Sequence, residues 1–185
     1  MVLKDDNVIV LDFMATGRAA GRREPIAQVL GLKYFSLLEI VIKQDATVKN
    51  GEILYIGADK RDVVDHIKRR IVVNELTTFA KSELPFMVKK IVDEDEKRFF
   101  DFFNTARSVS TRMHQLELLP GVGKKHMWQI IEERKKGLFT SFDNVKTRIK
   151  LLPDPKEAII KRIMIEIENE NERYRLFVAG RPTRY

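Results

Sequence analysis

The sequence predicts an α+β protein in which a small antiparallel β-barrel is followed by an all-α domain. Up to about residue 73, apolar and β-branched residues gather in short runs separated by turn signals, as they do in all-β domains. From Asn74 onward the apolar residues recur at the spacing of helices instead. Hydrophobic residues make up 44% of the 185 residues, which is enough to build a sizeable core.

The β-rich domain is predicted to span residues 1–74. Its strand-like runs are residues 7–13, 27–43, 52–57 and 62–73. The second run holds one or two strands, with Gly31 expected at a bulge or kink. The segment KNG, residues 49–51, is a turn signal. Short strands joined by turns predict a small barrel or curled sheet.

Residues 75–110 are predicted to form a helical connector. Thr77 or Ser82 is expected to cap its start, and Pro85 fits a first helical turn. The run FFDFF, Phe99–Phe103, is the densest aromatic cluster of the chain. Nucleic-acid-binding proteins use exposed aromatic side chains to stack on bases. At helical spacing, however, adjacent phenylalanines spread around the helix, so we expect this run to fill a core.

The rest of the chain is predicted to be a helical domain, residues 111–170, followed by a C-terminal strand and basic tail, residues 171–185. The expected helices are 111–118, 124–135, 142–149 and 154–168. The segment RYRLFVAG, residues 173–180, is predicted to return as a strand, and RPTRY ends the chain.

Positive charge is concentrated in the last third of the chain. The net charge is +7, and residues 111–185 alone carry 16 basic and 10 acidic side chains. The preceding residues are nearly balanced in charge. Such a skew favours an anionic polymer as the partner. A basic surface that faces only water is the alternative.

The composition also indicates the cellular compartment in which the protein is expected. The absence of cysteine excludes disulfides, thiolate zinc sites and cysteine nucleophiles, and is compatible with a reducing compartment. The N-terminal segment carries Asp5, Asp6 and Asp12 beside a short apolar run, which does not fit a signal peptide. No apolar run approaches the roughly 18 residues that a membrane span requires. We therefore expect a cytoplasmic protein with no membrane partner.

Two segments of the last third repeat each other. Residues 116–131, LELLPGVGKKHMWQII, align with residues 149–164, IKLLPDPKEAIIKRIM. The shared Leu-Leu-Pro predicts two successive helix–turn–helix units, but the turn PGVG of the first becomes PDPK in the second. Glycine allows positive φ and a close approach of backbone to ligand, whereas Asp-Pro does neither. We expect the second unit to have kept its packing and lost the ability to hold a phosphate.

The PGVG turn, residues 120–123, has the chemistry of an anion site. Pro120 ends the preceding helix, and the helix that starts near Lys124 leaves its first N–H groups without intrahelical partners. Those donors lie at the positive end of the helix dipole, and Lys124 and Lys125 add further positive charge. Because none of these groups reads a base edge, the turn would position nucleic acid without specifying its sequence. The alternative is a turn that only connects two core helices.

These residues resemble a known motif. LLPGVGKKHMWQII resembles the helix-hairpin-helix motif, whose core is an apolar residue, Pro-Gly-apolar-Gly and then a helix. RKKGLFTSFDNVKTRI also resembles the segment that follows it in paired helix-hairpin-helix domains, where a degenerate second hairpin is common. The resemblance covers roughly residues 110–168 and implies sequence-independent contact with a nucleic-acid backbone.

The whole chain resembles an uncharacterised archaeal family for which nucleic-acid binding is expected. That family combines an oligonucleotide/oligosaccharide-binding (OB-like) barrel with helix-hairpin-helix helices. The resemblance implies that the N-terminal barrel is OB-like, and it carries no settled activity across to this chain.

The basic loop GRAAGRREP, residues 17–25, is a second candidate contact. It holds Arg18, Arg22 and Arg23 between two predicted strands. Basic loops between strands flank the strand-binding groove in OB-like barrels, and a solvated loop is the alternative. Gly17 and Gly21 lack the Gly-Lys-Ser/Thr ending of a nucleotide-binding P-loop.

The histidines and the tryptophan are expected to have structural or surface roles. His66, His114 and His126 have no metal-ligand spacing with one another. His114 and His126 flank the PGVG turn, where surface or packing roles are favoured over phosphate contact. Trp128, the single tryptophan, is expected to be a core anchor between the hairpin helices.

Two acidic features favour an enzyme as an alternative. The run DEDEKR, residues 93–98, could hold magnesium, although acids near a helix N-terminus ordinarily face water. Asp143 follows the hairpin by about the spacing of the catalytic Asp in helix-hairpin-helix DNA glycosylases. It also fits the first turn of a helix capped by Ser141, and no catalytic lysine stands in the matching pattern.

The sequence therefore predicts a non-enzymatic protein that binds DNA or RNA through the phosphate backbone. No cofactor, metal or small-molecule substrate is expected. The expected contacts are the hairpin and the basic loop: Leu119, Pro120, Gly121, Val122, Gly123, Lys124, Lys125, Arg18, Arg22 and Arg23. A nuclease or glycosylase-like enzyme and a protein-interaction scaffold are the alternatives.

Overall fold

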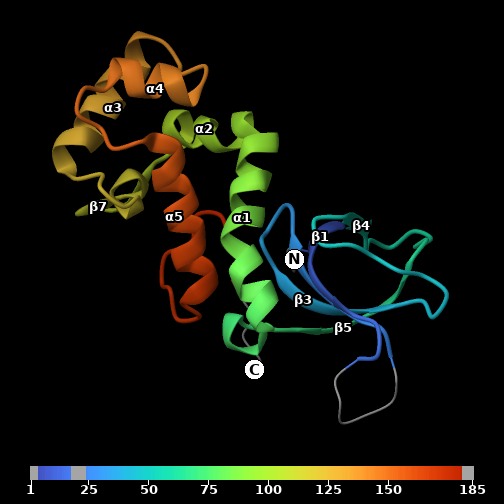
Figure 1. Cartoon of the computed structure of the whole chain (residues 1–185). Coiled ribbons are helices and arrows are strands. Elements are labelled where there is room, and N and C mark those ends of the chain that lie inside the picture. The colour runs from blue at the N-terminus through green and yellow to red at the C-terminus, as the bar shows by residue number, and fades with distance from the viewer. Residues whose placement is uncertain (1–3, 18–23, 181–185) are drawn as a thin grey trace. The chain divides into compact units, whose positions relative to one another are not determined.

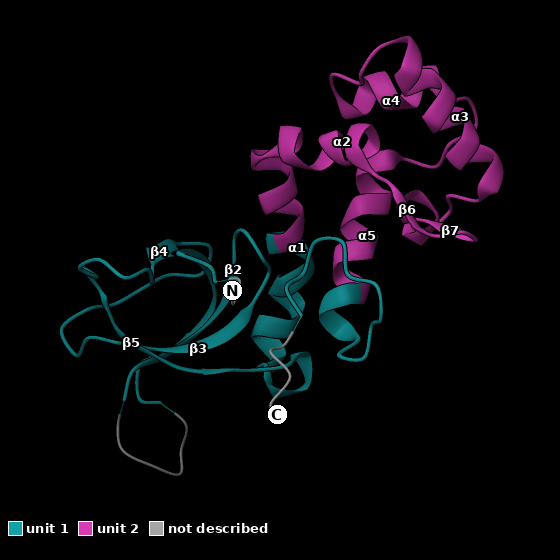
Figure 2. Ribbon diagram, turned by 180° about the vertical axis from the view of Figure 1, so that it is seen from behind, with its two compact units in different colours: residues 1–87, 166–185 teal, residues 88–165 magenta. Residues whose placement is uncertain are grey.

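The computed structural model describes residues 4–17 and 24–180. The chain divides into two compact units, residues 1–87 with 166–185 (unit 1) and residues 88–165 (unit 2), as Figure 2 shows. These boundaries cut across the predicted ones. The predicted connector is divided between the two units, and the C-terminal residues cluster with the β-rich unit.

Unit 1 is built on a curled, five-stranded antiparallel sheet (Figure 1). Its strands are β1 Asn7–Met14, β2 Ile26–Gly31, β3 Leu37–Ile42, β4 Ile53–Tyr55 and β5 Val64–Arg70. Their order in the sheet is β4-β1-β2-β3-β5. Because β4 and β5 are the edges, the sheet is a half-barrel, which is the curled-sheet form of the predicted small barrel or curled sheet. The predicted strands are confirmed, and the run 27–43 contains two of them.

The core of unit 1 lies inside the curl of the sheet. Val8, Val10, Val29 and Ile40 are fully buried there. Strands β2 and β3 are buried along their whole length, so both faces of the sheet are covered at its centre. Strand β1 shifts register between Val10 and Asp12, and such a bulge increases the local twist.

A buried carboxylate fixes the turn between β2 and β3. Asp5 accepts hydrogen bonds from the backbone N–H groups of Lys33 and Tyr34 at 2.8 Å, and from that of Ser36 at 3.4 Å. A Cβ on Gly31 would lie 2.0 Å from an oxygen of this carboxylate. Gly31 is therefore required by a close approach at the end of β2, not by the predicted bulge.

A 3-10 helix, η1 Val73–Glu75, leads from the sheet into helix α1, Thr78–Glu94. The Thr77 hydroxyl caps α1 by accepting the N–H of Ala80 at 3.0 Å, as predicted. Ser82 and Pro85 both lie inside α1, so the predicted placement of Pro85 in a first turn is wrong. Pro85 is exposed, and water can reach the carbonyl that its missing N–H leaves without a partner.

Unit 2 is helical and has an aromatic core. Its helices are α2 Glu96–Thr105, α3 Lys124–Lys136, α4 Phe142–Arg148 and, to residue 165, α5 Pro155–Glu168. Phe99 and Phe103 are fully buried. Phe142 meets Phe100 and Phe103 edge to face, with ring centroids 6.2 and 6.4 Å apart. The prediction that the FFDFF run fills a core is confirmed.

The predicted helix 111–118 is not formed as such. Strands β6 Ser108–Ser110 and β7 Met113–His114 pair with each other, and only Gln115–Leu118 is helical, as the 3-10 helix η2. Serine and threonine side chains compete for backbone hydrogen bonds and so disfavour a helix. Here the Ser110 hydroxyl accepts the N–H of Arg112 at 3.3 Å. The other expected helices of this region occur within one residue of their predicted bounds.

The segment 173–180 is irregular, so the predicted C-terminal strand is wrong. It is held by Glu166, which is fully buried. The carboxylate of Glu166 accepts the N–H groups of Leu176, Phe177 and Val178 at 2.8, 3.0 and 3.0 Å. In the part of the chain that is described, no helix has both the length and the apolar character needed to cross a membrane.

Candidate nucleic-acid interface

The PGVG turn joins η2 to α3 as a β-turn. The N–H of Val122 donates to the carbonyl of Leu119 at 3.1 Å, and Gly121 has a φ of +83°. Proline followed by a glycine with positive φ is the pattern of a type II turn. Leu119 and Val122 are buried, whereas Gly121 is exposed. Apolar side chains therefore anchor the turn and leave its glycines at the surface.

The two glycines of the turn serve different purposes. At Gly121 a Cβ would lie 2.8 Å from Cγ of Pro153, so both the positive φ and the close packing demand glycine. Gly123 has ordinary extended angles, with φ −91° and ψ −179°. A Cβ on Gly123 would meet no other atom within 4 Å among the described residues. The fold requires glycine at the first position and not at the second.

Helix α3 starts without a side-chain cap and with unfavourable charge. Gly123 occupies the N-cap position, and no side chain bonds to the first N–H groups. The first turn holds no acidic residue and begins with Lys124 and Lys125, at the end of the dipole where cations are disfavoured. Both lysines are exposed, and no described carboxylate pairs with either. Such an N-terminus is suited to binding an external anion.

The corresponding turn of the second unit, PDPK (residues 153–156), carries its own anionic side chain. Helix α5 begins at Pro155, and the Asp154 carboxylate accepts the N–H groups of Lys156 and Glu157 at 3.0 and 3.1 Å. Partial burial raises the pKa of Asp154, but the hydrogen bond from Glu157 and the charge of Lys146 outweigh it, so the pKa lies below its ordinary value. The site that α3 leaves open is therefore occupied in α5 by an ionised side chain.

A buried histidine holds the segment before the first turn. Nδ1 of His114 accepts the N–H of Leu116 at 3.1 Å, and Glu117 accepts the backbone N–H of His114 at 2.8 Å. Burial lowers the pKa of His114, the charge of Arg134 lowers it further, and Glu117 opposes them. His114 is therefore a neutral capping residue at pH 7, which agrees with the packing role expected for it.

Two arginines of unit 2 are used to hold the backbone. Arg162, buried in α5, donates to the carbonyl of Leu118 at 3.4 Å, directly before the PGVG turn. Arg134 donates to the carbonyls of Phe103 and Ala106 at 3.2 and 2.8 Å. Part of the positive charge of this region therefore stabilises the fold.

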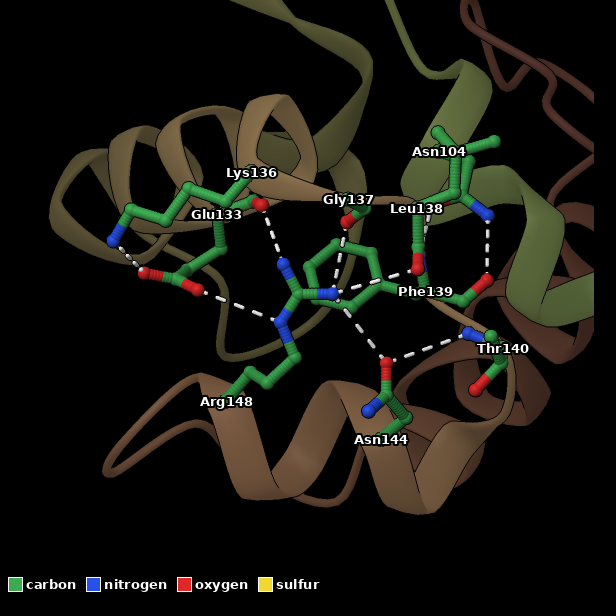
Figure 3. A network of polar contacts seen from close by, with 9 residues as sticks. All are labelled: Asn104, Glu133, Lys136, Gly137, Leu138, Phe139, Thr140, Asn144 and Arg148. Carbon is green, nitrogen blue, oxygen red and sulfur yellow. Dashed lines mark hydrogen bonds and ion pairs between the residues drawn. The ribbon is translucent and has the colours of Figure 1, made fainter.

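Arg148 joins α4 to the end of α3, as Figure 3 shows. Its guanidinium donates to the carbonyl of Gly137 at 2.9 Å and pairs with the carboxylate of Glu133 at 3.4 Å. It lies over the ring of Phe139, 4.5 Å from the centroid. Asn104 holds the same loop, because its side chain bonds both backbone groups of Phe139 at 2.8 and 2.9 Å. A cation at the C-terminal end of α3 also complements the helix dipole.

Trp128 is exposed, so its predicted role as a core anchor is wrong. Its exposed fraction is 59%, whereas Met127 and Ile130 of the same helix are buried. Successive helix residues point about 100° apart, and in α3 Met127 faces the core while Trp128 faces solvent. Trp128 instead borders a surface hollow of about 650 Å³ whose lining includes Lys124, Arg107 and Arg112. Neither arginine was among the predicted contacts, although both flank the Ser/Thr-rich turn that breaks the expected helix.

The remaining candidates are the arginines of the basic loop and two of the histidines. Arg18, Arg22 and Arg23 lie outside the described residues. His126 is half-buried in the first turn of α3. Exposed His66 contacts its neighbour Asp65 at 2.6 Å.

The acidic candidates lie at helix ends. Ser141 caps α4 by accepting the N–H of Asn144 at 3.0 Å, and exposed Asp143 lies in the first turn. Asp93 pairs with Lys89 at 2.7 Å and with Lys156 at 2.9 Å. Among the residues that the structure describes, no three acidic or histidine side chains gather in a way that could hold a metal ion.

Comparison with known proteins shows the family. The model of a family described as "Protein of unknown function (DUF655)" matches residues 4–179. The chain belongs to the DUF655 family. The uncharacterized protein MJ0038 of Methanocaldococcus jannaschii is 43% identical over 170 residues, which cover 91% of this chain and 77% of that protein. The crystal structure of Af1531 from Archaeoglobus fulgidus, described by the same family model, has a TM-score of 0.85 at 48% identity. It matches 95% of this chain and 100% of its own.

Substitutions at the two glycines are expected to change stability in opposite directions. Gly121→Ala should lower the free energy of unfolding by about 2 kcal/mol or more, because of positive φ and the contact with Pro153. Gly123→Asp should raise it by about 1 kcal/mol, because a carboxylate at the N-cap satisfies the free N–H groups of α3. Chemical denaturation measures both. Equal destabilisation by the two variants would contradict the assignment of the N-cap.

His114 is expected to make the fold sensitive to acid. Because the pKa of His114 is lower in the folded than in the unfolded chain, its contribution is complete above about pH 6.5 and is lost as pH falls through the folded-state value. His114→Asn keeps an acceptor for the N–H of Leu116 and removes the titration. The Tm of the wild type should therefore fall more than that of the variant between pH 7.5 and pH 5. Parallel curves would exclude this role.

Proposed function

We propose that this protein binds DNA or RNA without sequence preference, through the phosphate backbone and without catalysing a reaction. In this proposal the PGVG turn and the start of α3 act as the hairpin of a helix-hairpin-helix motif. The N–H groups after Gly123 contact one phosphate, and Lys124 and Lys125 contribute charge. The proposal extends to both nucleic acids because backbone amides contact phosphate and not the sugar.

The start of α3 is the observation that carries the proposal. Helices α2, α4 and α5 also begin in unit 2, and each has an acidic residue in its first turn, namely Glu96, Asp143 or Glu157. Of the four α-helices that begin among the described residues of unit 2, only α3 has no acidic residue in its first turn. It also has no side-chain cap, and its first turn begins with two lysines. This arrangement costs stability in the isolated protein. A bound phosphate would supply the missing acceptor and the missing negative charge together.

The charge distribution around the turn supports an extended anion as partner. Lys135 and Lys136, at the other end of α3, pair with Glu132 and Glu133 at 2.7 and 2.5 Å. Lys124 and Lys125 have no such partners among the described residues. On a surface that only faces water, lysines are ordinarily interspersed with carboxylates. Lysines that remain unpaired beside a free helix N-terminus instead favour a chain of phosphates as the partner.

Unit 1 offers a second contact surface in this proposal. A hollow of about 560 Å³ lies beside the sheet, lined by Lys4, Arg61, Ile67 and Arg70 among others. If the half-barrel is OB-like, this hollow would hold part of a strand of nucleic acid, as the binding surfaces of such barrels do. The turn in unit 2 is nevertheless the contact on which the proposal depends.

Reversing both charges at the turn is expected to weaken binding to nucleic acid. Lys124→Glu with Lys125→Glu should lower the affinity for a short labelled duplex at least about tenfold and reduce the salt slope by about 2, because two phosphate contacts are lost. Fluorescence anisotropy between about 50 and about 200 mM salt measures both quantities. The fold should persist, since acidic residues are favourable in a first helical turn.

Two further variants make this test specific. Lys89→Glu with Lys90→Glu changes the net charge equally at another exposed lysine pair, on α1, and should weaken binding much less. Gly123→Asp should weaken binding although it stabilises the fold, because its carboxylate occupies the place proposed for the phosphate. Equal loss of affinity from both lysine pairs would indicate non-specific attraction, and wild-type affinity in all three variants would refute the hairpin as the contact.

A further inference from the structure

The exposed tryptophan of α3 is the feature that the backbone contact leaves unexplained. Trp128 is the single tryptophan of the chain and is 59% exposed. Leaving so large an apolar ring in water forgoes the free energy that its burial would provide. Trp128 lies four residues, or about 6 Å along the helix, beyond Lys124. Successive stacked bases are about 3.4 Å apart, so this distance along the helix is less than the rise of two bases from the proposed phosphate.

Trp128 stands between two surface hollows. The larger, about 650 Å³, lies between α3 and the β6–β7 hairpin, and its wall includes Met127 and Ile131. The smaller, about 380 Å³, lies between α3 and the end of α4, where it is lined by Gln129, Glu132, Lys150 and the ion pair of Arg148 with Glu133. An exposed ring with open space on both sides is accessible to a planar group.

The larger hollow is basic. Arg107, Arg112 and Lys124 line it, and no described carboxylate pairs with any of these side chains. The acidic residue that lines it, Glu117, already accepts the N–H of His114. Ser108, Ser110 and Thr111, which carry hydroxyl groups, also line this hollow. Hydroxyls and cations around an aromatic ring match the phosphate, sugar and base of a nucleotide.

We propose that Trp128 is a base-stacking platform, and that the preferred ligand is nucleic acid with unpaired bases next to the backbone contact. This inference rests on the proposed function. A phosphate binds at the start of α3, the next base leaves the strand and stacks on Trp128, and Arg107 and Arg112 contact the following phosphates. A base held in a duplex is already stacked on its neighbours and cannot lie on the ring.

Charge favours nucleic acid over a protein on this surface. Exposed tryptophan is also common in protein interfaces, where the surrounding centre is depleted in charged residues. Here Arg107, Arg112 and Lys124 lie on one side of the ring and pair with no described carboxylate, so a protein partner would have to match them with carboxylates one by one. A nucleic-acid strand supplies a phosphate at every step.

Fluorescence reports on this contact directly, because Trp128 is the only tryptophan. Titration with single-stranded oligothymidine should quench its emission, whereas a blunt duplex of equal length should bind without comparable quenching. Trp128→Ala should lower the affinity for the single strand about tenfold, because the stacking contact is lost. Its affinity for the duplex should stay within about twofold of the wild type, because the phosphate contacts remain. Trp128→Phe should keep most of the affinity for the single strand.

Other outcomes overturn the inference in distinguishable ways. If wild type and Trp128→Ala bind the single strand with equal affinity, the ring stacks on no base. The same conclusion follows if the variant loses affinity equally for the single strand and the duplex. In both cases nucleic-acid binding itself stands. A change in sedimentation on Trp128→Ala, without a change in strand affinity, would show a protein interface instead. Failure of the wild type to bind either oligonucleotide would refute the proposed function together with this inference.

Discussion

Every helix must find acceptors for its first backbone N–H groups, and unit 2 meets this requirement in two opposite ways. Asp154 supplies an ionised carboxylate to the start of α5. At the start of α3 the corresponding acceptor is missing, and lysines occupy positions where the dipole disfavours them. The account of function depends on this difference between two related turns, because the same physics that stabilises one helix leaves the other ready for an external anion.

Packing between the two turns keeps the open one in place. Gly121 lies against Pro153 so closely that no side chain fits, and Leu119 and Val122 are buried beneath it. Arg162 adds a buried hydrogen bond to Leu118 just before the turn. The backbone donors are therefore held by rigid neighbours before any ligand arrives. Preorganisation of this kind lowers the ordering cost of binding.

The sequence predicted those features that depend on local pattern. β-Branched runs located the strands, and apolar spacing located α4 and α5, with Ser141 marking the start of α4. The Leu-Leu-Pro echo identified the pair of turns, and the contrast between glycine and Asp-Pro distinguished them. That the first turn admits a phosphate stays a prediction. The Asp-Pro pair also had the pattern of an N-cap followed by a first-turn proline, so the internal anion could have been inferred from the same residues.

Features that depend on distant contacts were not predictable in this way. Apolar spacing allows Met127, Trp128 and Ile130 to face one core and does not show which of them stays exposed. The hairpin before η2 replaced the expected helix because the hydroxyl of Ser110 and the side chain of His114 bond the backbone there. Arg148 could have been a nucleic-acid contact by sequence alone, and its use at the end of α3 follows from the fold.

Backbone amide chemical shifts, followed by NMR during titration with a short oligonucleotide, locate the phosphate on the turn. We expect large downfield shifts for the amide protons of Lys124 and Lys125, which gain a phosphate acceptor. The amides of Lys156 and Glu157 should change little, because Asp154 already occupies them. Binding that leaves the first pair unchanged, or that shifts both pairs alike, would contradict the assignment of the phosphate to the start of α3.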